Sequence, residues 1–228
     1  MSNYDSDGSP DSDWEDRGDL AWNEFDWERY LRAQDEAVNR YLAYYEAFLG
    51  NPTRIDEVAR HMEWDNGEEP ADEAAAAEEA AEAMAEDFGT ECDVYTLHKN
   101  PIYISTRALY LRLRRKWELI ATDPSLVPQP LAVSYLSSLQ QGEDQAVQAV
   151  HALEFGDFAM AVSLFKRSLS TLNRSLALLN DAEVGKQRAV ADYRSDALIT
   201  LFDLREIWLR VISECRAELE RPVEDEDN

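Results

Sequence analysis

The fold is decided by residues 151–180, HALEFGDFAMAVSLFKRSLSTLNRSLALLN. Apolar side chains recur along the second part of this stretch at steps of three and four, a spacing that places them on one face of a helix. Gly156 and Asp157 stand just before this face, where a glycine ends one helix and an aspartate caps the next. The stretch therefore predicts a tight helical hairpin, whose second helix presents one apolar face made of Phe158, Ala161, Phe165, Leu169, Leu172, Leu176 and Leu179.

Helical periodicity continues on both sides of this hairpin. Apolar residues keep one phase through 130–155, which predicts a single helix that can kink at Gly142, and a heptad-like pattern predicts a last helix over 186–220. Short turns separate these two helices from the one at 157–180. Three long helices joined by short turns must pack antiparallel, so we expect them to form the core.

The N-terminal half predicts further helices. One runs from about Asn23 to Gly50 and carries a stripe rich in Trp and Tyr, which is either a core face or an exposed aromatic contact face. Asn-Pro pairs at 51–52 and 100–101 each predict the start of a helix, because the asparagine caps and the proline suits the first helical position. The second pair opens a helix over 101–121. The predicted fold class is all-α, as an antiparallel helical bundle or as repeat-like helical hairpins with disordered acidic tails.

The charge is concentrated in three segments. The net charge of the chain is -25, and residues 1–20, 61–93 and 223–228 together hold 24 of the 47 acids but one of the 22 bases. These segments therefore carry a net charge of −23, which leaves −2 for the rest of the chain. A nearly neutral folded body with solvated acidic segments is therefore expected.

This distribution predicts the domain organisation. Residues 1–20 are expected to be a disordered acidic tail, 21–221 a single all-helical domain and 222–228 a second acidic tail. Inside the domain, the Ala- and Glu-rich segment 63–93 has high helix propensity but few large apolar side chains, so we expect it to be mobile and loosely docked.

Several classes of protein are disfavoured by the composition. The chain has no apolar run long enough for a membrane span, and its polar, acidic N-terminus is unlike a signal peptide, so a soluble cytoplasmic protein is expected. Cys92 and Cys215 have no metal-site spacing, so they are expected to be reduced thiols. Direct nucleic-acid binding is disfavoured, because phosphate recognition needs a cationic surface.

The hairpin resembles a known repeat family. Its segment FGDFAMAVSLFKRSL, with Gly156, Asp157, Phe158, Ala161, Val162, Phe165, Ser168 and Leu169, is similar to the turn and second helix of a tetratricopeptide repeat. The resemblance covers about residues 146–172 as a single degenerate copy; Gln145 and Gln148 stand where the family usually has large apolar side chains. It implies a repeat-like helical hairpin and, by analogy, peptide or protein binding.

A run of cations on the predicted helix 101–121 is the candidate partner-binding site. No acid occurs between Val94 and Trp117, directly after the most acidic stretch of the chain. These cations are either a solvated helix face or a surface that holds an acidic segment, from residues 63–93 or from a partner. The candidate residues are Arg107, Arg112, Arg114, Arg115 and Lys116.

Metal chemistry has little to build on. Glu57 with His61, and His151 with Glu154, each lie one helical turn apart, but neither pair has the spacing of a di-metal bundle site. No phosphate-binding glycine loop or recognisable nucleophile setting occurs. We therefore expect no metal, no cofactor and no catalytic residues.

Three functional hypotheses follow. The first is a non-enzymatic adaptor or chaperone-like module that binds a partner peptide or protein in a groove between the first helix and the 101–121 helix, with a homodimer through exposed aromatic or heptad faces as a further possibility. The second is an acidic mimic or decoy that occupies a cationic partner surface. The third is a helical-bundle metal protein or enzyme that uses the two Glu and His pairs.

Overall fold

The computed structural model describes residues 22–64, 97–181 and 187–221, and in this part the regular elements are all helices. The tails predicted at 1–20 and 222–228 and most of the segment 63–93 lie outside the described residues. None of the helices in the described part is both long and apolar enough to cross a membrane. The helices are α1 Glu24–Ala47, α2 Arg54–His61, the 3₁₀ turn η2 Leu97–Lys99, α4 Pro101–Ala121, α5 Gln129–Glu154, α6 Phe158–Asn180 and α7 Arg188–Glu220.

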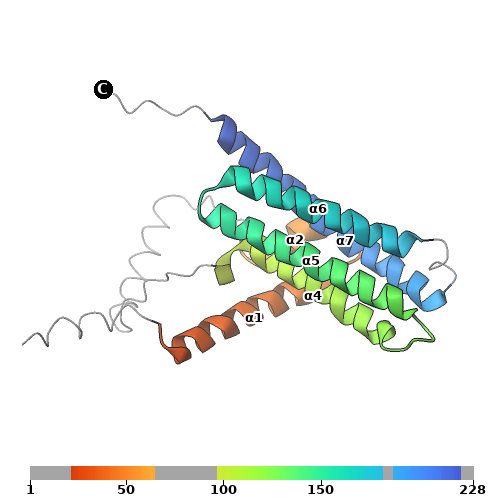
Figure 1. Ribbon diagram of the computed structural model, residues 1–228. Helices are drawn as coiled ribbons and strands as arrows, with labels where there is room; N and C mark the ends of the chain where they lie inside the picture. Colours follow the sequence, from red (N-terminus) through yellow and green to blue (C-terminus); the bar gives the residue numbers. More distant parts are fainter. Residues whose placement is uncertain (1–21, 65–96, 182–186, 222–228) are drawn as a thin grey trace, which may run out of the picture.

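Four long helices form an up-and-down bundle (Figure 1). Each of α4, α5, α6 and α7 packs on the next, and α7 closes the set by packing on α4. The core predicted from 130–155, 157–180 and 186–220 is therefore present, and α4 joins it as a fourth member. Large side chains from all four helices are fully buried at its centre, among them Trp117, Tyr135, Phe165 and Trp208.

The predicted helix starts are confirmed where a side chain caps the backbone. Asn23 accepts hydrogen bonds from the first turn of α1, and Asn100, with proline at the next position, does the same for α4. Asp157 caps α6 after Gly156, whose φ of 72° is the left-handed conformation that glycine adopts readily. The helical hairpin predicted around Gly156 is therefore present.

One predicted helix start is wrong. The Asn51-Pro52 pair forms a turn, and α2 begins two residues later with Thr53 at its cap position. The side chain of Asn51 accepts hydrogen bonds from the backbone and hydroxyl of Thr53 instead of capping the helix. Asparagine stabilises tight turns as well as helix ends, so the pattern alone could not separate the two.

Helix α1 is divided into a buried half and an exposed half. Its residues Val38, Tyr41 and Tyr45 are buried against the bundle, whereas Phe25 and Leu31 are exposed. In Figure 1 the start of α1 diverges from the bundle. The aromatic stripe predicted from the sequence is thus a core face in its second half and an accessible face in its first.

Gly142 has a packing role that the sequence did not reveal. Helix α5 continues through it, and the Oη atom of Tyr110 would lie only 2.5 Å from a Cβ atom added at this position. The hydroxyl of Ser168 on α6 donates to the Gly142 carbonyl at 2.7 Å. The glycine therefore makes room for Tyr110 at a point where α4, α5 and α6 meet.

Candidate partner-binding site

A cavity of about 420 Å³ lies between α1, the chain after α2, η2 and α4. The sequence suggested a partner groove between the first helix and the 101–121 helix; in the cavity α1 supplies four of the eight lining residues and α4 supplies Ile104. Volumes of this size are typical of sites that hold a ligand or a few side chains. The lining residues are Ala33, Glu36, Ala37, Arg40, Met62, Trp64, Lys99 and Ile104.

The cavity combines an apolar floor with a charged rim. Ala37, Met62 and Ile104 are buried, while Glu36, Arg40 and Lys99 are exposed at the edge. An apolar side chain entering the cavity would lose water from its surface, which contributes about 25 cal/mol per Å² buried. The two cations outnumber the single carboxylate of Glu36, so the rim favours a carboxylate beside that side chain. The arrangement therefore suits a segment with an apolar anchor next to an acidic residue.

The walls of the cavity are fixed by aromatic and polar contacts. Trp64 stacks on Tyr41 with 5.6 Å between ring centroids. Next to Tyr41, the hydroxyl of Tyr45 donates to the Asp203 carboxylate of α7, and burial followed by this hydrogen bond raises the pKa of Tyr45 well above its usual value. Arg54 of α2 donates to both oxygens of Asp203 at 2.6 Å. These contacts tie α1 and α2 to α7.

The cations predicted as one partner-binding face do not share an exposed face. Arg112 is 2% exposed and points into the bundle. Its guanidinium donates to Glu46 of α1 at 2.7 Å, to both oxygens of Asp196 of α7 at 2.7 and 2.8 Å, and to the Thr200 hydroxyl at 2.6 Å. Burial alone would lower the pKa of Arg112, but the hydrogen bonds to Asp196 and Glu46 raise it, so the buried side chain keeps its charge.

The other candidate cations divide between paired and exposed positions. Arg107 donates to Glu143 of α5 at 2.6 Å, and Arg114 forms an ion pair with the same buried carboxylate. Burial, with a smaller contribution from neighbouring Arg107, lowers the pKa of Arg114. Lys116 binds Asp196 at 3.1 Å, whereas Arg115 is exposed. Four of the five cations are thus used inside the fold.

This pairing limits which cations could meet an acidic segment. A surface that recognises an acidic segment needs accessible cations, and Arg112 is not accessible in this structure. The predicted docking of 63–93 on helix 101–121 involves residues outside the described part, so it stays a prediction. The acids that pair with these cations come from α1, α5 and α7, which a charge count along the sequence could not identify.

The two Glu and His pairs lie on different helices, α2 and α5, and three of their four side chains have a described contact. On α2, His61 stacks on Phe48 at 5.0 Å, and Glu57 accepts a hydrogen bond from Arg60 at 2.7 Å. On α5, Glu154 accepts from the Asn100 side chain. Residues 22–64, 97–181 and 187–221 contain no group of three or more His, Cys, Asp or Glu side chains that could hold a metal ion.

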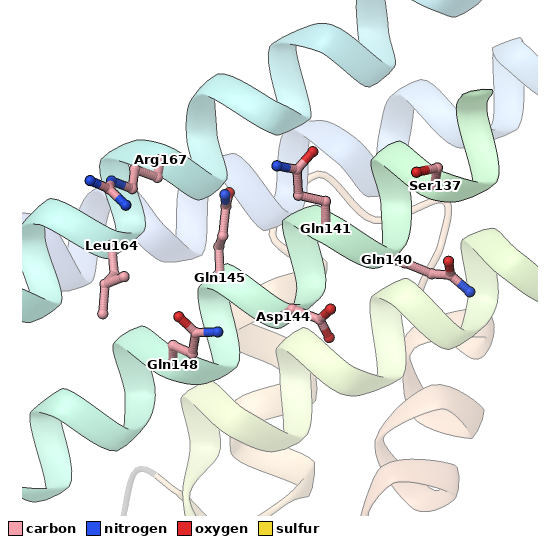
Figure 2. Close-up of a pocket in the computed structure, with 8 residues that line it drawn as sticks. All are labelled: Ser137, Gln140, Gln141, Asp144, Gln145, Gln148, Leu164 and Arg167. Atoms are coloured by element: carbon pink, nitrogen blue, oxygen red, sulfur yellow. The ribbon is translucent and has the colours of Figure 1, made fainter.

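A second cavity of about 420 Å³ was not predicted from the sequence. It lies along the outer face of α5 beside α6 (Figure 2). The only hint in the sequence was polar side chains at Gln145 and Gln148, where the repeat family has apolar ones. Its lining residues are Ser137, Gln140, Gln141, Asp144, Gln145, Gln148, Leu164 and Arg167.

The chain was compared with protein-family models, with curated proteins and with solved structures. None of the three comparisons found a match. The tetratricopeptide-like character of the hairpin therefore remains a resemblance carried by the residues around Gly156.

Proposed function

We propose that this chain is a non-enzymatic helical protein-interaction module, which binds a segment of a partner protein in the cavity between α1 and α4. The observation that carries the proposal is the cavity itself, which has an apolar floor and a rim where Arg40 and Lys99 outnumber Glu36. Interfaces obtain most of their affinity from a few side chains buried in such pockets. The bound segment would place an apolar side chain on Met62 and Ile104.

The positions of the side chains with strongly shifted pKa values support binding more than catalysis. In the described part the strongly perturbed groups are buried tyrosines and ion-paired side chains that link helices. Tyr135 and Tyr193, for example, hydrogen bond to each other inside the core, where burial raises the pKa of Tyr135 above its usual value. Such groups hold the bundle together, and none of them lines either cavity.

Site-specific photo-crosslinking tests the proposal. A photoreactive amino acid at Ala33, which lines the cavity, is expected to label a partner, whereas the same group at Asn39, an exposed position on α1, is expected not to. The partner is then purified and its affinity is measured directly. Ala33→Trp, which would fill part of the cavity, should weaken that affinity at least tenfold, and Asn39→Trp should leave it unchanged. Equal effects of the two tryptophans would refute the proposed site.

An acidic decoy is the second candidate, and it rests on the sequence. Residues 61–93 hold thirteen acids and no Lys or Arg, which suits a cationic partner surface. Deletion of 63–93 separates the two functions. A decoy would lose its partner on deletion, while a module that uses the α1 cavity would keep it.

A further inference from the structure

The outer face of α5 carries hydrogen-bonding groups that the fold does not use. Gln140, Gln141 and Gln148 line the cavity beside α6 and form no hydrogen bond within the described part of the chain. Gln145 is held differently, because the Thr171 hydroxyl of α6 donates to its Oε1 atom at 2.9 Å. That contact leaves the Nε2 group of Gln145 as a donor toward the cavity.

The facing wall contributes a cation. Helix α6 carries Lys166, Arg167 and Arg174 but no acid, and none of the three takes part in an ion pair with the residues described. Figure 2 shows Arg167 on α6 above Gln145, with Leu164 one turn away on the same helix. The groove is therefore lined by amides, by one serine, by one apolar side chain, by the exposed guanidinium of Arg167 and by the exposed carboxylate of Asp144, which in Figure 2 points away from α6. We name this set of residues the amide groove.

The spacing of the amides matches a peptide main chain. From Gln141 to Gln148 the helix rises about 10.5 Å at 1.5 Å per residue, which is the length of about three residues of an extended peptide. The whole lining, from Ser137 to Gln148, spans about 16 Å, or about five extended residues. Each glutamine offers one acceptor and two donors, the complement of the alternating C=O and N–H groups of a main chain.

Hydrogen bonds join the two helices that bear the groove. Between α5 and α6, the hydroxyls of Ser138 and Ser175 lie 2.8 Å apart, and Ser168 donates to the Gly142 carbonyl at 2.7 Å. These small residues let the two helix backbones approach, so the longer Gln and Arg side chains stand above the seam on both sides. Because these contacts hold α5 and α6 in place, the groove is already formed before a peptide binds, which lowers the cost of binding.

We propose that the amide groove binds an extended segment of a partner protein through its main chain, with a single carboxylate of that segment facing Arg167. The net charge of the chain limits how many carboxylates the bound segment can carry. The net charge of -25 repels a run of acids at long range, whereas one carboxylate gains the local contact with Arg167 at little long-range cost. The proposal concerns a surface separate from the α1 cavity and does not depend on it.

A defined peptide provides the probe. It has nine residues of alternating serine and alanine with one leucine and one glutamate, and both ends are blocked. In ¹H–¹⁵N spectra of the full chain, millimolar peptide should shift the side-chain amide signals of Gln141, Gln145 and Gln148. Methylation of alternate peptide nitrogens should weaken binding at least tenfold, because two or more main-chain hydrogen bonds of about 1 kcal/mol each are lost and 1.4 kcal/mol is tenfold. Equal binding of the methylated peptide would refute main-chain recognition.

A charge swap tests the role of Arg167. Replacing the glutamate of the peptide with lysine should weaken binding about fivefold, although the net charge of the chain favours a cationic peptide. In Arg167→Glu the preference should reverse, while Arg205→Glu, at an exposed position on α7, should keep the original preference. A lysine peptide that binds the unaltered chain as tightly as the glutamate peptide would overturn the assignment.

Two further outcomes also count against the proposal. If none of the glutamine amide signals moves at about 10 mM peptide, which is about tenfold above a millimolar Kd, the groove does not bind main chains. If deletion of 1–20 or of 222–228 strengthens peptide binding severalfold, the occupant is an acidic tail of this chain and not a partner segment. Gln148→Ala should weaken binding about fivefold, and the exposed amide variant Asn173→Ala should not.

Discussion

The buried guanidinium of Arg112 offers the sharpest test of the structure. Arg112 joins three helices, because it lies on α4 and donates to Glu46 on α1 and to Asp196 and Thr200 on α7. Its charge also lies 5.7 Å from the ring centroid of Tyr45. The substitution Arg112→Met keeps much of the length of the side chain and removes every donor.

The expected loss follows from what the substitution leaves behind. Removing one partner of a buried ion pair costs about 3–5 kcal/mol, because the other charge stays buried without compensation. Here the side chains of Asp196 and Glu46 are 28% and 42% exposed, so water can reach both carboxylates, and Lys116 stays near them. We therefore expect Arg112→Met to lower the free energy of unfolding by about 3 kcal/mol, the lower end of that range. Arg112→Lys keeps the charge but cannot reach all three partners, so about 1–2 kcal/mol is expected.

Urea unfolding followed by circular dichroism measures this loss. Arg115→Met, on the same helix at an exposed position, is the matched control and should change the free energy of unfolding by less than about 0.5 kcal/mol. A double-mutant cycle of Arg112→Met with Asp196→Asn should give a coupling energy above about 1 kcal/mol. Because buried pairs are poorly screened, the loss should persist in about 1 M NaCl. A loss below about 1 kcal/mol, or one that disappears in high salt, would show that Arg112 is not buried in the ion-pair network.

Three other predictions concern single residues of the bundle. Phe165→Ala should lower the free energy of unfolding by about 3–5 kcal/mol, because the ring is fully buried near Trp208, and a change below about 1 kcal/mol would place it outside the core. Gly142→Ala should cost about 1–3 kcal/mol, since its methyl group would lie 2.5 Å from the Tyr110 Oη atom; Tyr110→Phe in the same chain should recover part of this loss. Burial alone would raise the pKa of Asp196, but hydrogen bonds from Arg112 and Lys116 lower it below the usual value. The ionised Asp196 therefore adds to the free energy of unfolding above about pH 4, and this contribution is lost as the pH falls through the lowered pKa. The free energy of unfolding of Asp196→Asn should therefore fall less in acid than that of the unaltered chain. Equal slopes of this free energy against pH would contradict the prediction.

The sequence predicted best those features that depend on neighbouring residues. Helix caps are local, so Asn23, Asn100 and Asp157 could each be identified from a few positions. The buried face of α6 could be identified in the same way, because helical spacing places Phe165 and Leu172 on one side. An Asn-Pro pair is equally local, yet it also stabilises turns, and the start of α2 was therefore misplaced.

Contacts between distant residues could not be predicted from the sequence. The cations of α4 stood next to an acidic segment in the sequence, which suggested an exposed face with a neighbouring partner. In the structure Arg112 instead finds Asp196, 84 positions away, and Arg107 finds Glu143, 36 positions away. The amide groove was missed for a related reason, since Arg167 joins the glutamines of α5 only after the hairpin has folded.

The network of buried charges also explains how the two proposed surfaces differ. Asp196 and Asp203 lie seven residues apart on one face of α7, and each receives an arginine from another helix, Arg112 of α4 and Arg54 of α2. Two donors of one guanidinium on one carboxylate fix the orientation of the arginine as well as its distance from the acid. These contacts therefore determine the positions of α1 and α2 on the bundle and the shape of the α1 cavity. The cations that do so are no longer free to bind a partner. On α6, by contrast, Lys166, Arg167 and Arg174 have no acid beside them on their helix. Recognition at the α1 cavity should therefore depend mainly on the apolar fit of a side chain, with a smaller contribution from the rim charges, and recognition at the amide groove on hydrogen bonds and on the charge of Arg167.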